Sequence, residues 1–220
     1  MRIAGSLCVI LALAGTTFAQ SLTTDQILAK LDEKAKTFQT FEASIVMVQV
    51  LSDLKQPPES GKVYMKAAGK SSPMVLMDIT TPTKSAKTAL IRDGKASLYN
   101  RPQNSYQEYR ADANSNTFQL LLTGLGVSAE TMKKYYTPQA KTSETIDGVA
   151  TEVLDLTFLQ PGQFKKLTLW LDAKAWTPVQ IRITARSNDT TDYKYSNVRL
   201  NKGVSDSVFK LNIPKDAVKQ

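Results

Sequence analysis

The chain has 220 residues, a formal net charge of +8 and no histidine, and its one cysteine is Cys8. A chain with no imidazole and a single thiol near its N-terminus excludes histidine-based catalysis, internal disulfides and the usual zinc sites. The basic residues are mostly scattered lysines, which favours a solvated surface, able to rest weakly on anionic lipid headgroups, over a nucleic-acid site.

The first 19 residues have the pattern of a secretory signal peptide. Arg2 gives a positive start, Leu7–Gly15 is apolar, and Thr17-Phe18-Ala19 offers small residues at the positions that a signal peptidase reads. The apolar run is too short for a membrane span, and Cys8 lies inside it, which argues against a lipid anchor on that thiol. We expect cleavage after Ala19 and one domain over residues 20–220, with an uncleaved N-terminal anchor as the alternative.

The domain opens with a helical pattern and continues with strands. Thr24–Thr40 has apolar residues at helical spacing, and Thr23 with Gln26 resembles a capping box. Phe41–Leu51 is apolar on both faces through its middle, so we expect both faces to be covered. Shorter strands follow at Gly61–Lys66, Met74–Thr80, Ala89–Arg92, Ala96–Tyr99 and Tyr106–Tyr109. The last three form a meander with a tight turn at Asp93-Gly94.

Two short helices are expected next, at Asn116–Thr123 and at Ser128–Tyr136, the second with Ser128 as its N-cap. Gly124 and Gly126 lie between them and could serve as hinges. The remaining strands are predicted at Lys141–Thr145, Val149–Phe158, Phe164–Asp172, Val179–Arg186, Thr191–Leu200 and Val208–Ile213. Because short turns join these strands, the sequence predicts an antiparallel sheet with local strand order.

Fragments of catalytic and metal-binding motifs lack their partners. Ser52-Asp53-Leu54-Lys55 fits S-x-x-K but falls in a predicted loop, and Gly69-Lys70-Ser71 lacks the first glycine of a phosphate loop. Asp189 and Asp192 could hold a cation, yet no series of ligands follows them. We therefore expect no enzyme, no cofactor and no metal site.

The remaining signal is apolar. Met47, Met65, Met74 and Met77 fall on three consecutive predicted strands, and flexible Met side chains form walls that adapt to varied ligands. Filling a core is the alternative reading of the same residues. The apolar helix at Asn116–Thr123 could be a lid over a pocket, or could pack permanently on the sheet.

Four segments, in this order along the chain, resemble the LolA-like family of periplasmic outer-membrane lipoprotein carriers. Phe41-Glu42-Ala43-Ser44 resembles the family's first strand, and Gly61–Lys66 its G-x-L-W-V-K strand. Ile91–Pro102 is similar to the meander S-D-G-K…Y-N-P with Arg101 inserted, and Val208–Pro214 is similar to the terminal F-x-F-x-x-P strand. The resemblance covers most of residues 20–220.

The resemblance implies an α+β fold, mainly antiparallel: an unclosed half-barrel with an N-terminal helix and short lid helices over a hydrophobic cavity for acyl chains. It implies a periplasmic carrier that receives lipoproteins from an inner-membrane ABC exporter and delivers them to an outer-membrane receptor. Relatives of this fold bind other lipids or sense envelope stress, and both remain alternatives. We expect a monomer.

Two departures from the family affect the lid and the cavity. Ala67 and Ala68 stand where the family often has Arg-Pro, whose Arg helps to hold the lid shut, and smaller residues replace bulky aromatic ones on the cavity wall. Following one face of each strand, we expect the wall and lid to consist of Ile45, Met47, Val63, Met65, Val75, Met77, Ile79, Leu98, Phe118, Leu121 and Leu122. A shift of one residue in register would invert the strand part of this set.

Overall fold

The computed structural model of the protein describes residues 21–67, 73–110 and 125–220. The helices in these ranges are α1 (Thr24–Thr37) and α3 (Ala129–Tyr135), with short 3-10 helices η1 (Thr83–Ser85) and η2 (Asp206–Val208). The strands of the N-terminal half are β1 (Thr40–Leu51), β2 (Leu54–Lys55), β3 (Glu59–Lys66), β4 (Met74–Thr81), β5 (Lys87–Arg92), β6 (Lys95–Asn100) and β7 (Ser105–Arg110). The later strands are β8 (Tyr136–Ile146), β9 (Val149–Phe158), β10 (Phe164–Asp172), β11 (Pro178–Ala185), β12 (Thr190–Leu200) and β13 (Val218–Lys219).

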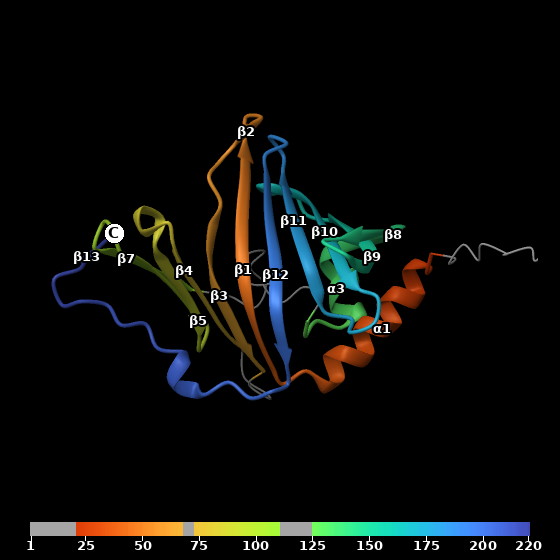
Figure 1. The fold of residues 1–220 in the computed structure, drawn as a ribbon, viewed down its shortest axis with the longest axis horizontal. Coiled ribbons are helices and arrows are strands. Elements are labelled where there is room, and N and C mark those ends of the chain that lie inside the picture. The colour runs from red at the N-terminus through yellow and green to blue at the C-terminus, as the bar shows by residue number, and fades with distance from the viewer. Residues whose placement is uncertain (1–20, 68–72, 111–124) are drawn as a thin grey trace, which may run out of the picture.

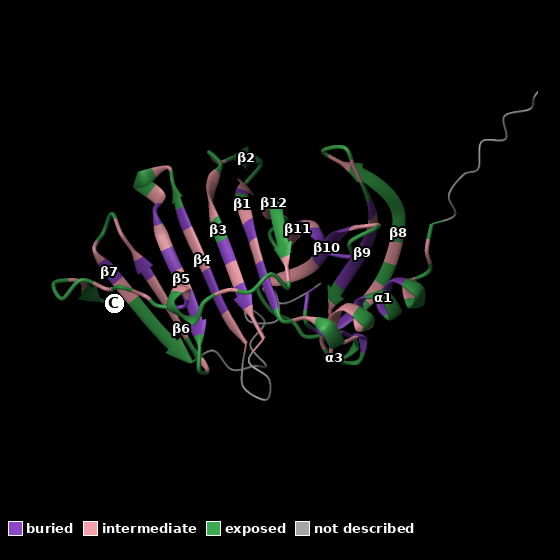
Figure 2. Ribbon diagram, turned by 60° about the horizontal axis from the view of Figure 1, so that its bottom comes forward, coloured by how far each residue is buried: buried purple, intermediate pink, exposed green. Residues whose placement is uncertain are grey.

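The strands of the described residues form one sheet whose two edges do not pair with each other. Its order is β13-β7-β6-β5-β4-β3-β1-β12-β11-β10-β9-β8, with β2 paired to β1 off this path. Every pair is antiparallel except β13 with β7. Figure 1 shows the sheet spread as a fan, and Figure 2 shows its curvature, with α1 and α3 beside β8 and β9. The predicted α+β, mainly antiparallel, unclosed half-barrel is confirmed.

The pair β1–β12 joins the two halves of the sheet. Ile45 lies opposite Tyr195 and Met47 opposite Tyr193, although the two strands come from opposite ends of the chain. The predicted local strand order therefore holds within each half except at β13, which pairs with β7, and it does not hold at the centre. Both faces of β1 were expected to be covered, and this was wrong: Val46, on the face away from the main core, is 37% exposed.

The inner face of the sheet carries the main core. It is the face that bears Ile45 and Val63, and its buried side chains form one cluster with α1 and α3. Leu28 and Leu31 of α1 and Met132 of α3 are almost inaccessible to solvent within this cluster. The amphipathic face of α1, which the sequence predicts, is thus buried against the sheet.

Capping fixes both ends of α1. Thr23 Oγ1 accepts a hydrogen bond from the Gln26 backbone N at 3.3 Å, and Gln26 Oε1 accepts one from the Thr23 backbone N at 2.8 Å, so the predicted capping box is confirmed. The helix ends at Thr37, earlier than predicted, because Phe38 is extended. Asn201 Nδ2 donates to the carbonyl oxygen of Thr37 at 2.8 Å, and Asn201 Oδ1 accepts hydrogen bonds from the backbone N of Gln39 and of Thr40.

Residues 201–217, here called the C-terminal strap, cross the opposite, outer face of the sheet. The strand predicted at Val208–Ile213 is wrong: Val208 is the last residue of η2, residues 209–213 have irregular backbone, and β13 beyond them pairs with the sheet. Phe209 is fully buried with Leu76 and Leu90 of the outer face. Because the burial of Phe209 fixes the strap, its backbone does not need a ladder of strand hydrogen bonds.

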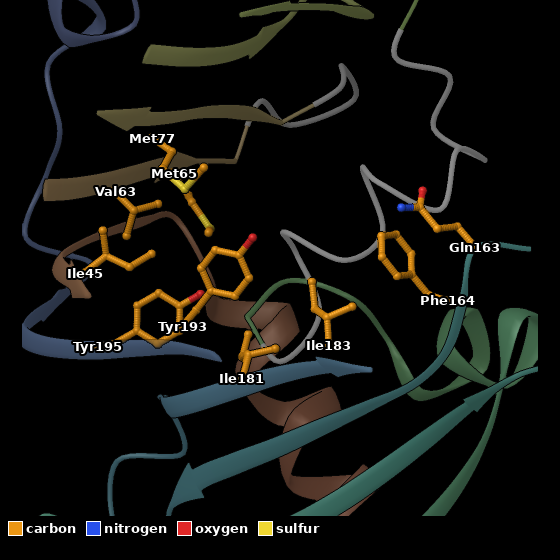
Figure 3. A pocket seen from close by; sticks show the side chains of 10 residues that line it. All are labelled: Ile45, Val63, Met65, Met77, Gln163, Phe164, Ile181, Ile183, Tyr193 and Tyr195. Atoms are coloured by element: carbon orange, nitrogen blue, oxygen red, sulfur yellow. The ribbon is translucent and has the colours of Figure 1, made fainter. Parts of the chain in front are cut away.

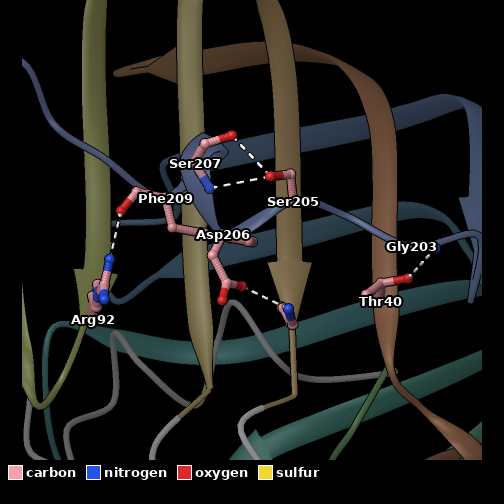
Figure 4. Close-up of polar contacts among 8 residues, drawn as sticks. Thr40, Arg92, Gly203, Ser205, Asp206, Ser207 and Phe209 are labelled. Carbon is pink, nitrogen blue, oxygen red and sulfur yellow. Dashed lines mark hydrogen bonds and ion pairs between the residues drawn. The ribbon is translucent and has the colours of Figure 1, made fainter.

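Polar contacts fasten the strap along its length (Figure 4). The Gly203 backbone N donates to Thr40 Oγ1 at 3.1 Å, and Lys66 Nζ lies 2.6 Å from an Asp206 carboxylate oxygen. Arg92 donates to the Phe209 carbonyl oxygen at 3.2 Å. Ser205 Oγ accepts from the Ser207 backbone N and caps η2. These polar contacts join the strap to β1, β3 and β5 of the N-terminal half.

Arg101, the residue inserted relative to the family motif, is part of the outer face. Its guanidinium pairs with Asp78, donates to Thr88 Oγ1 at 2.8 Å and donates to the Ile79 carbonyl oxygen at 3.1 Å. Three bonds from one side chain hold the β6–β7 turn against β4 and β5. The insertion therefore has a structural role away from the inner face.

Candidate functional site

A cavity of about 180 Å³ lies on the inner face, between the two halves of the sheet. Its walls come from β1, β3 and β4 on one side and from β10, β11 and β12 on the other (Figure 3). The lining residues are Ile45, Val63, Met65, Met77, Gln163, Phe164, Ile181, Ile183, Tyr193 and Tyr195. Apart from the Gln163 amide and two phenol hydroxyls, the lining side chains are apolar.

Strand register explains why these side chains meet. Side chains two residues apart on a strand point to the same face, and residues paired across an antiparallel ladder share that face. Val63 pairs with Met77, and Tyr193 pairs with Ile181. The pairing of Ile45 with Tyr195 then connects the two sets across the centre of the sheet.

Four residues of the predicted wall line this cavity: Ile45, Val63, Met65 and Met77. The other four described residues of the predicted wall are on the inner face of the sheet but do not line this cavity. Val75 and Ile79 are buried in the main core, Leu98 is half-buried on β6, and Met47 lines a neighbouring pocket of about 260 Å³. Their contact with lipid stays a prediction.

The remaining predictions about the pocket and its lid concern residues that do not line this cavity or that lie outside the described ranges. Phe118, Leu121 and Leu122, on the expected lid helix, lie outside the described residues, as do Gly124 and the signal peptide over residues 1–19. Gly126 has a packing role, since a Cβ atom there would lie 3.1 Å from the Phe38 ring. Met74 points to the outer face, where it packs against the cluster beneath the strap.

Sequence reasoning missed the half of the wall that the C-terminal strands supply. These residues are Gln163, Phe164, Ile181, Ile183, Tyr193 and Tyr195. The clean alternation of Val179–Arg186 was a usable signal, because it places Ile181 and Ile183 on one face. What the sequence did not reveal was the β1–β12 pairing that turns this face toward Ile45.

Two phenols, Tyr193 and Tyr195, are among the polar groups of the cavity. Burial raises the pKa of the Tyr193 hydroxyl to about 12, and the nearby Glu59 carboxylate acts in the same direction. Burial, with a smaller contribution from Tyr193, also raises the pKa of Tyr195 above its usual range. The ring of Tyr195 packs edge-on against Phe41 at a centroid distance of 5.9 Å. Both hydroxyls therefore stay protonated at neutral pH.

A charged pair borders the inner face beside Met47. Glu59 lies opposite Met47 in the β1–β3 ladder, and its Oε2 is 2.6 Å from Lys87 Nζ. The Glu59 side chain is only 16% exposed. The contact is an ion pair by distance and not a well-angled hydrogen bond, because Oε2 has no hydrogen-bond partner of suitable geometry among the described residues. Negative charge near Tyr193 is thus largely balanced by Lys87.

Within the described ranges, no group of three or more Asp, Glu, Cys or His side chains is arranged to hold a metal ion. Asp192, considered above as a cation ligand, instead accepts two hydrogen bonds from Arg182, at 2.6 and 2.9 Å. No helix of the described residues is both long and apolar enough to cross a membrane.

No protein-family model matches the sequence, and no curated protein sequence matches it significantly. Solved structures do resemble it. An uncharacterised conserved protein from Thermus thermophilus has a TM-score of 0.56 at 12% identity, covering 89% of this chain and 98% of that one. A chain of the Pseudomonas aeruginosa MucA/MucB complex has a TM-score of 0.52 at 10% identity, covering 86% of this chain but only 61% of its own length.

A LolA superfamily protein from Nitrosomonas europaea is also among the similar structures, with a TM-score of 0.39 and 18% identity over 87% of this chain and 99% of that one. At these identities, the likeness to the Thermus and Pseudomonas structures shows the fold alone. The chain therefore shares with them the architecture of one curved, open antiparallel sheet with helices packed on its inner side.

Proposed function

We propose that the protein is a periplasmic lipid carrier, which binds acyl chains of lipoproteins in the inner-face cavity and moves them from the inner to the outer membrane. The observation that carries the proposal is the apolar cavity between the two halves of the sheet. Binding there removes apolar acyl surface from water, which is favourable by about 0.8 kcal/mol for each buried CH₂ group. The protein acts by binding and release, without lipid turnover.

The size of the cavity bears on how a chain would enter. Small-molecule pockets commonly measure roughly 300–1,000 Å³, and this cavity measures about 180 Å³. It therefore accommodates part of one acyl chain in this conformation, and longer chains require the walls to move. Met65 and Met77, which are unbranched and flexible, are suited to such movement.

The free energy of removing an acyl chain from a membrane determines how the carrier must be loaded. Pulling an acyl chain from a bilayer loses the same free energy per CH₂ that the cavity returns, so transfer is favourable only when loading is driven or exchange is direct. The resemblance to LolA-like carriers implies an inner-membrane ABC exporter as donor and an outer-membrane receptor as acceptor, and we propose these partners. The protein acts as a monomer that leaves the cytoplasm by its signal peptide.

Mass spectrometry of protein purified gently from the native envelope tests this function. Lipoprotein or other acylated lipid should co-purify with the wild-type protein. It should be absent from Ile183→Trp, in which a large ring fills the cavity, and retained by Val46→Trp on the opposite face of the sheet. Lipid-free wild-type protein, or equal lipid on both variants, would overturn the proposal.

The alternative function is a sensor that binds a signalling protein. The shared fold with a chain of the MucA/MucB complex favours it, although this chain spans only 61% of that structure's length. Cross-linking in intact cells separates the two functions. A carrier should cross-link to acylated lipoproteins, whereas a sensor should cross-link to one membrane-bound regulator and to no lipoprotein.

A further inference from the structure

The two phenols of the cavity have an arrangement that a purely apolar pocket does not need. Tyr193 and Tyr195 are two residues apart on β12, so their side chains project from the same face about 7 Å apart along the strand. Figure 3 shows the Tyr193 hydroxyl on the side of Met65 and the Tyr195 hydroxyl beside Tyr193, both among the residues that line the cavity. The two hydroxyl groups therefore follow one another along the face of β12 that lines the cavity.

Neither hydroxyl has a hydrogen-bond partner among the described residues, whereas the Tyr99 hydroxyl, for example, donates to Asn104. An unpaired hydroxyl in apolar surroundings is unfavourable, and it is normally satisfied by protein, water or ligand. The remaining lining side chains are apolar apart from Gln163, so the cavity itself offers little to satisfy them. A ligand with a hydrogen-bond acceptor would do so.

The electrostatic surroundings select the kind of acceptor. Both phenols remain protonated at neutral pH, because burial raises the pKa of each. They can therefore donate. An anionic acceptor would lose hydration among the apolar side chains, and none of the described lining residues is a cation that could compensate it. The acceptor that fits best is a neutral carbonyl oxygen.

We infer that Tyr193 and Tyr195 donate hydrogen bonds to the carbonyl oxygens of an acyl ester or amide. The pair thereby makes the cavity selective for neutral acylated lipids over hydrocarbons and over fatty-acid anions. This inference rests on the proposed function, because it assumes that the cavity binds lipid. It adds the part of the lipid that is recognised and the two side chains that recognise it.

Competition binding with matched short ligands tests the inference. An apolar fluorescent dye is bound to the purified, delipidated protein and then displaced by methyl decanoate, undecane or decanoate. The wild-type protein should bind the ester most tightly. Methyl decanoate has one carbonyl oxygen, so the loss of both donors in the double variant Tyr193→Phe with Tyr195→Phe should weaken its binding about fivefold, the effect of one neutral hydrogen bond, and each single variant should weaken it by less. Their binding of undecane should not change.

Tyr109→Phe is the matched control, because Tyr109 is 51% exposed and lies on β7, away from the cavity. It should behave as the wild type with all three ligands. Thermal unfolding of each variant establishes that the fold is retained, since removing an unpaired hydroxyl leaves the ring in place.

The outcomes separate this inference from the proposed function. If the dye and undecane bind but the Phe variants bind the ester as the wild type does, the inference fails and the lipid-binding cavity stands. If decanoate binds more tightly than the ester, the selectivity for neutral carbonyls is wrong. If neither dye nor any ligand binds to the wild type, the proposed function fails and the inference fails with it.

Discussion

Arg92 on β5 donates a hydrogen bond to the carbonyl oxygen of Phe209 at 3.2 Å, while the Phe209 ring is fully buried under the strap. The strap is thus held at one residue by both a polar and an apolar contact. Phe209 also contacts Leu76 and Leu90 on the outer face, where Val204, Val208 and Leu211 of the strap pack against the same cluster. The strap is therefore part of the folded core and not a loose C-terminal tail.

We predict that Phe209→Ala lowers the free energy of unfolding by about 3–5 kcal/mol, because it removes a buried aromatic ring and leaves a cavity. Urea denaturation followed by circular dichroism measures the change. Leu54→Ala, at a side chain that is 69% exposed on β2, is the matched control and should change stability by less than about 0.5 kcal/mol. A loss for Phe209→Ala no larger than that of the control would show that the strap does not stabilise the sheet.

Gly61 is important for the fold because another strand passes very close to it. A Cβ atom at this position would lie 1.9 Å from the Asp78 carbonyl oxygen, on the neighbouring strand, next to a register irregularity between Ser60 and Gly61. We predict that Gly61→Ala forces β3 and β4 apart and costs at least about 3 kcal/mol, at the upper end of overpacking effects. Denaturation midpoints would measure it.

The control for Gly61 is Gly94→Ala, at the β5–β6 turn. Gly94 has a φ of +71°, and no atom lies within 4 Å of the position that a Cβ atom would take, so only backbone strain of about 1–2 kcal/mol is expected. Equal effects at the two positions would mean that the close approach of β3 and β4 is not what requires glycine at residue 61.

Local pattern was enough to predict most elements. The strand Val149–Phe158 has the predicted bounds, because Asp147 and Gly148 both take the positive φ of a tight turn and the strand is apolar enough to be buried. Ser128 caps α3 as expected. Val208–Ile213 also has alternating apolar residues, yet it is not a strand, since the burial of Phe209 against the outer face determines its path.

Half of the candidate site could also be predicted from local sequence pattern. The inner faces of β1, β3 and β4 follow from period-two alternation, and Ile45, Val63 and Met77 were placed correctly on one face. Tyr193 was not, because its position depends on the pairing of β12 with β1, a contact between distant parts of the chain. No local pattern specifies which edge of a strand meets which partner.

Filling the cavity should abolish lipid binding while the protein stays folded. Ile183 is half-buried on β11 and lines the cavity, so the larger ring of Ile183→Trp can occupy space that is otherwise empty. We predict a stability change within about 1–3 kcal/mol and no displaceable dye binding, measured by fluorescence titration. Val46→Trp, on the other face of β1, should bind dye as the wild type does. Unchanged dye binding in Ile183→Trp would place the ligand elsewhere.

The phenols of the cavity predict how stability depends on alkaline pH. The pKa of Tyr193 is raised to about 12 by burial and by Glu59, and that of Tyr195 is raised in the same direction. A phenol in the unfolded chain ionises near pH 10, roughly its reference value. Above that pH the unfolded state releases a proton that the folded state retains, so stability falls as pH rises. Each phenol contributes a slope of up to about 1.4 kcal/mol per pH unit until its own folded pKa is reached.

Urea denaturation at several pH values between 9 and 11.5, a range set by the roughly normal phenol pKa of the unfolded chain, measures this slope. The double variant Tyr193→Phe with Tyr195→Phe should lose less stability than the wild type as pH rises, because its cavity carries no ionisable group. Tyr109→Phe, at an exposed phenol, should follow the wild type. The same two hydroxyls that we infer to recognise a carbonyl oxygen would then be identified by an independent measurement as buried and protonated. Parallel slopes for the wild type and the double variant would show instead that both phenols have free access to water.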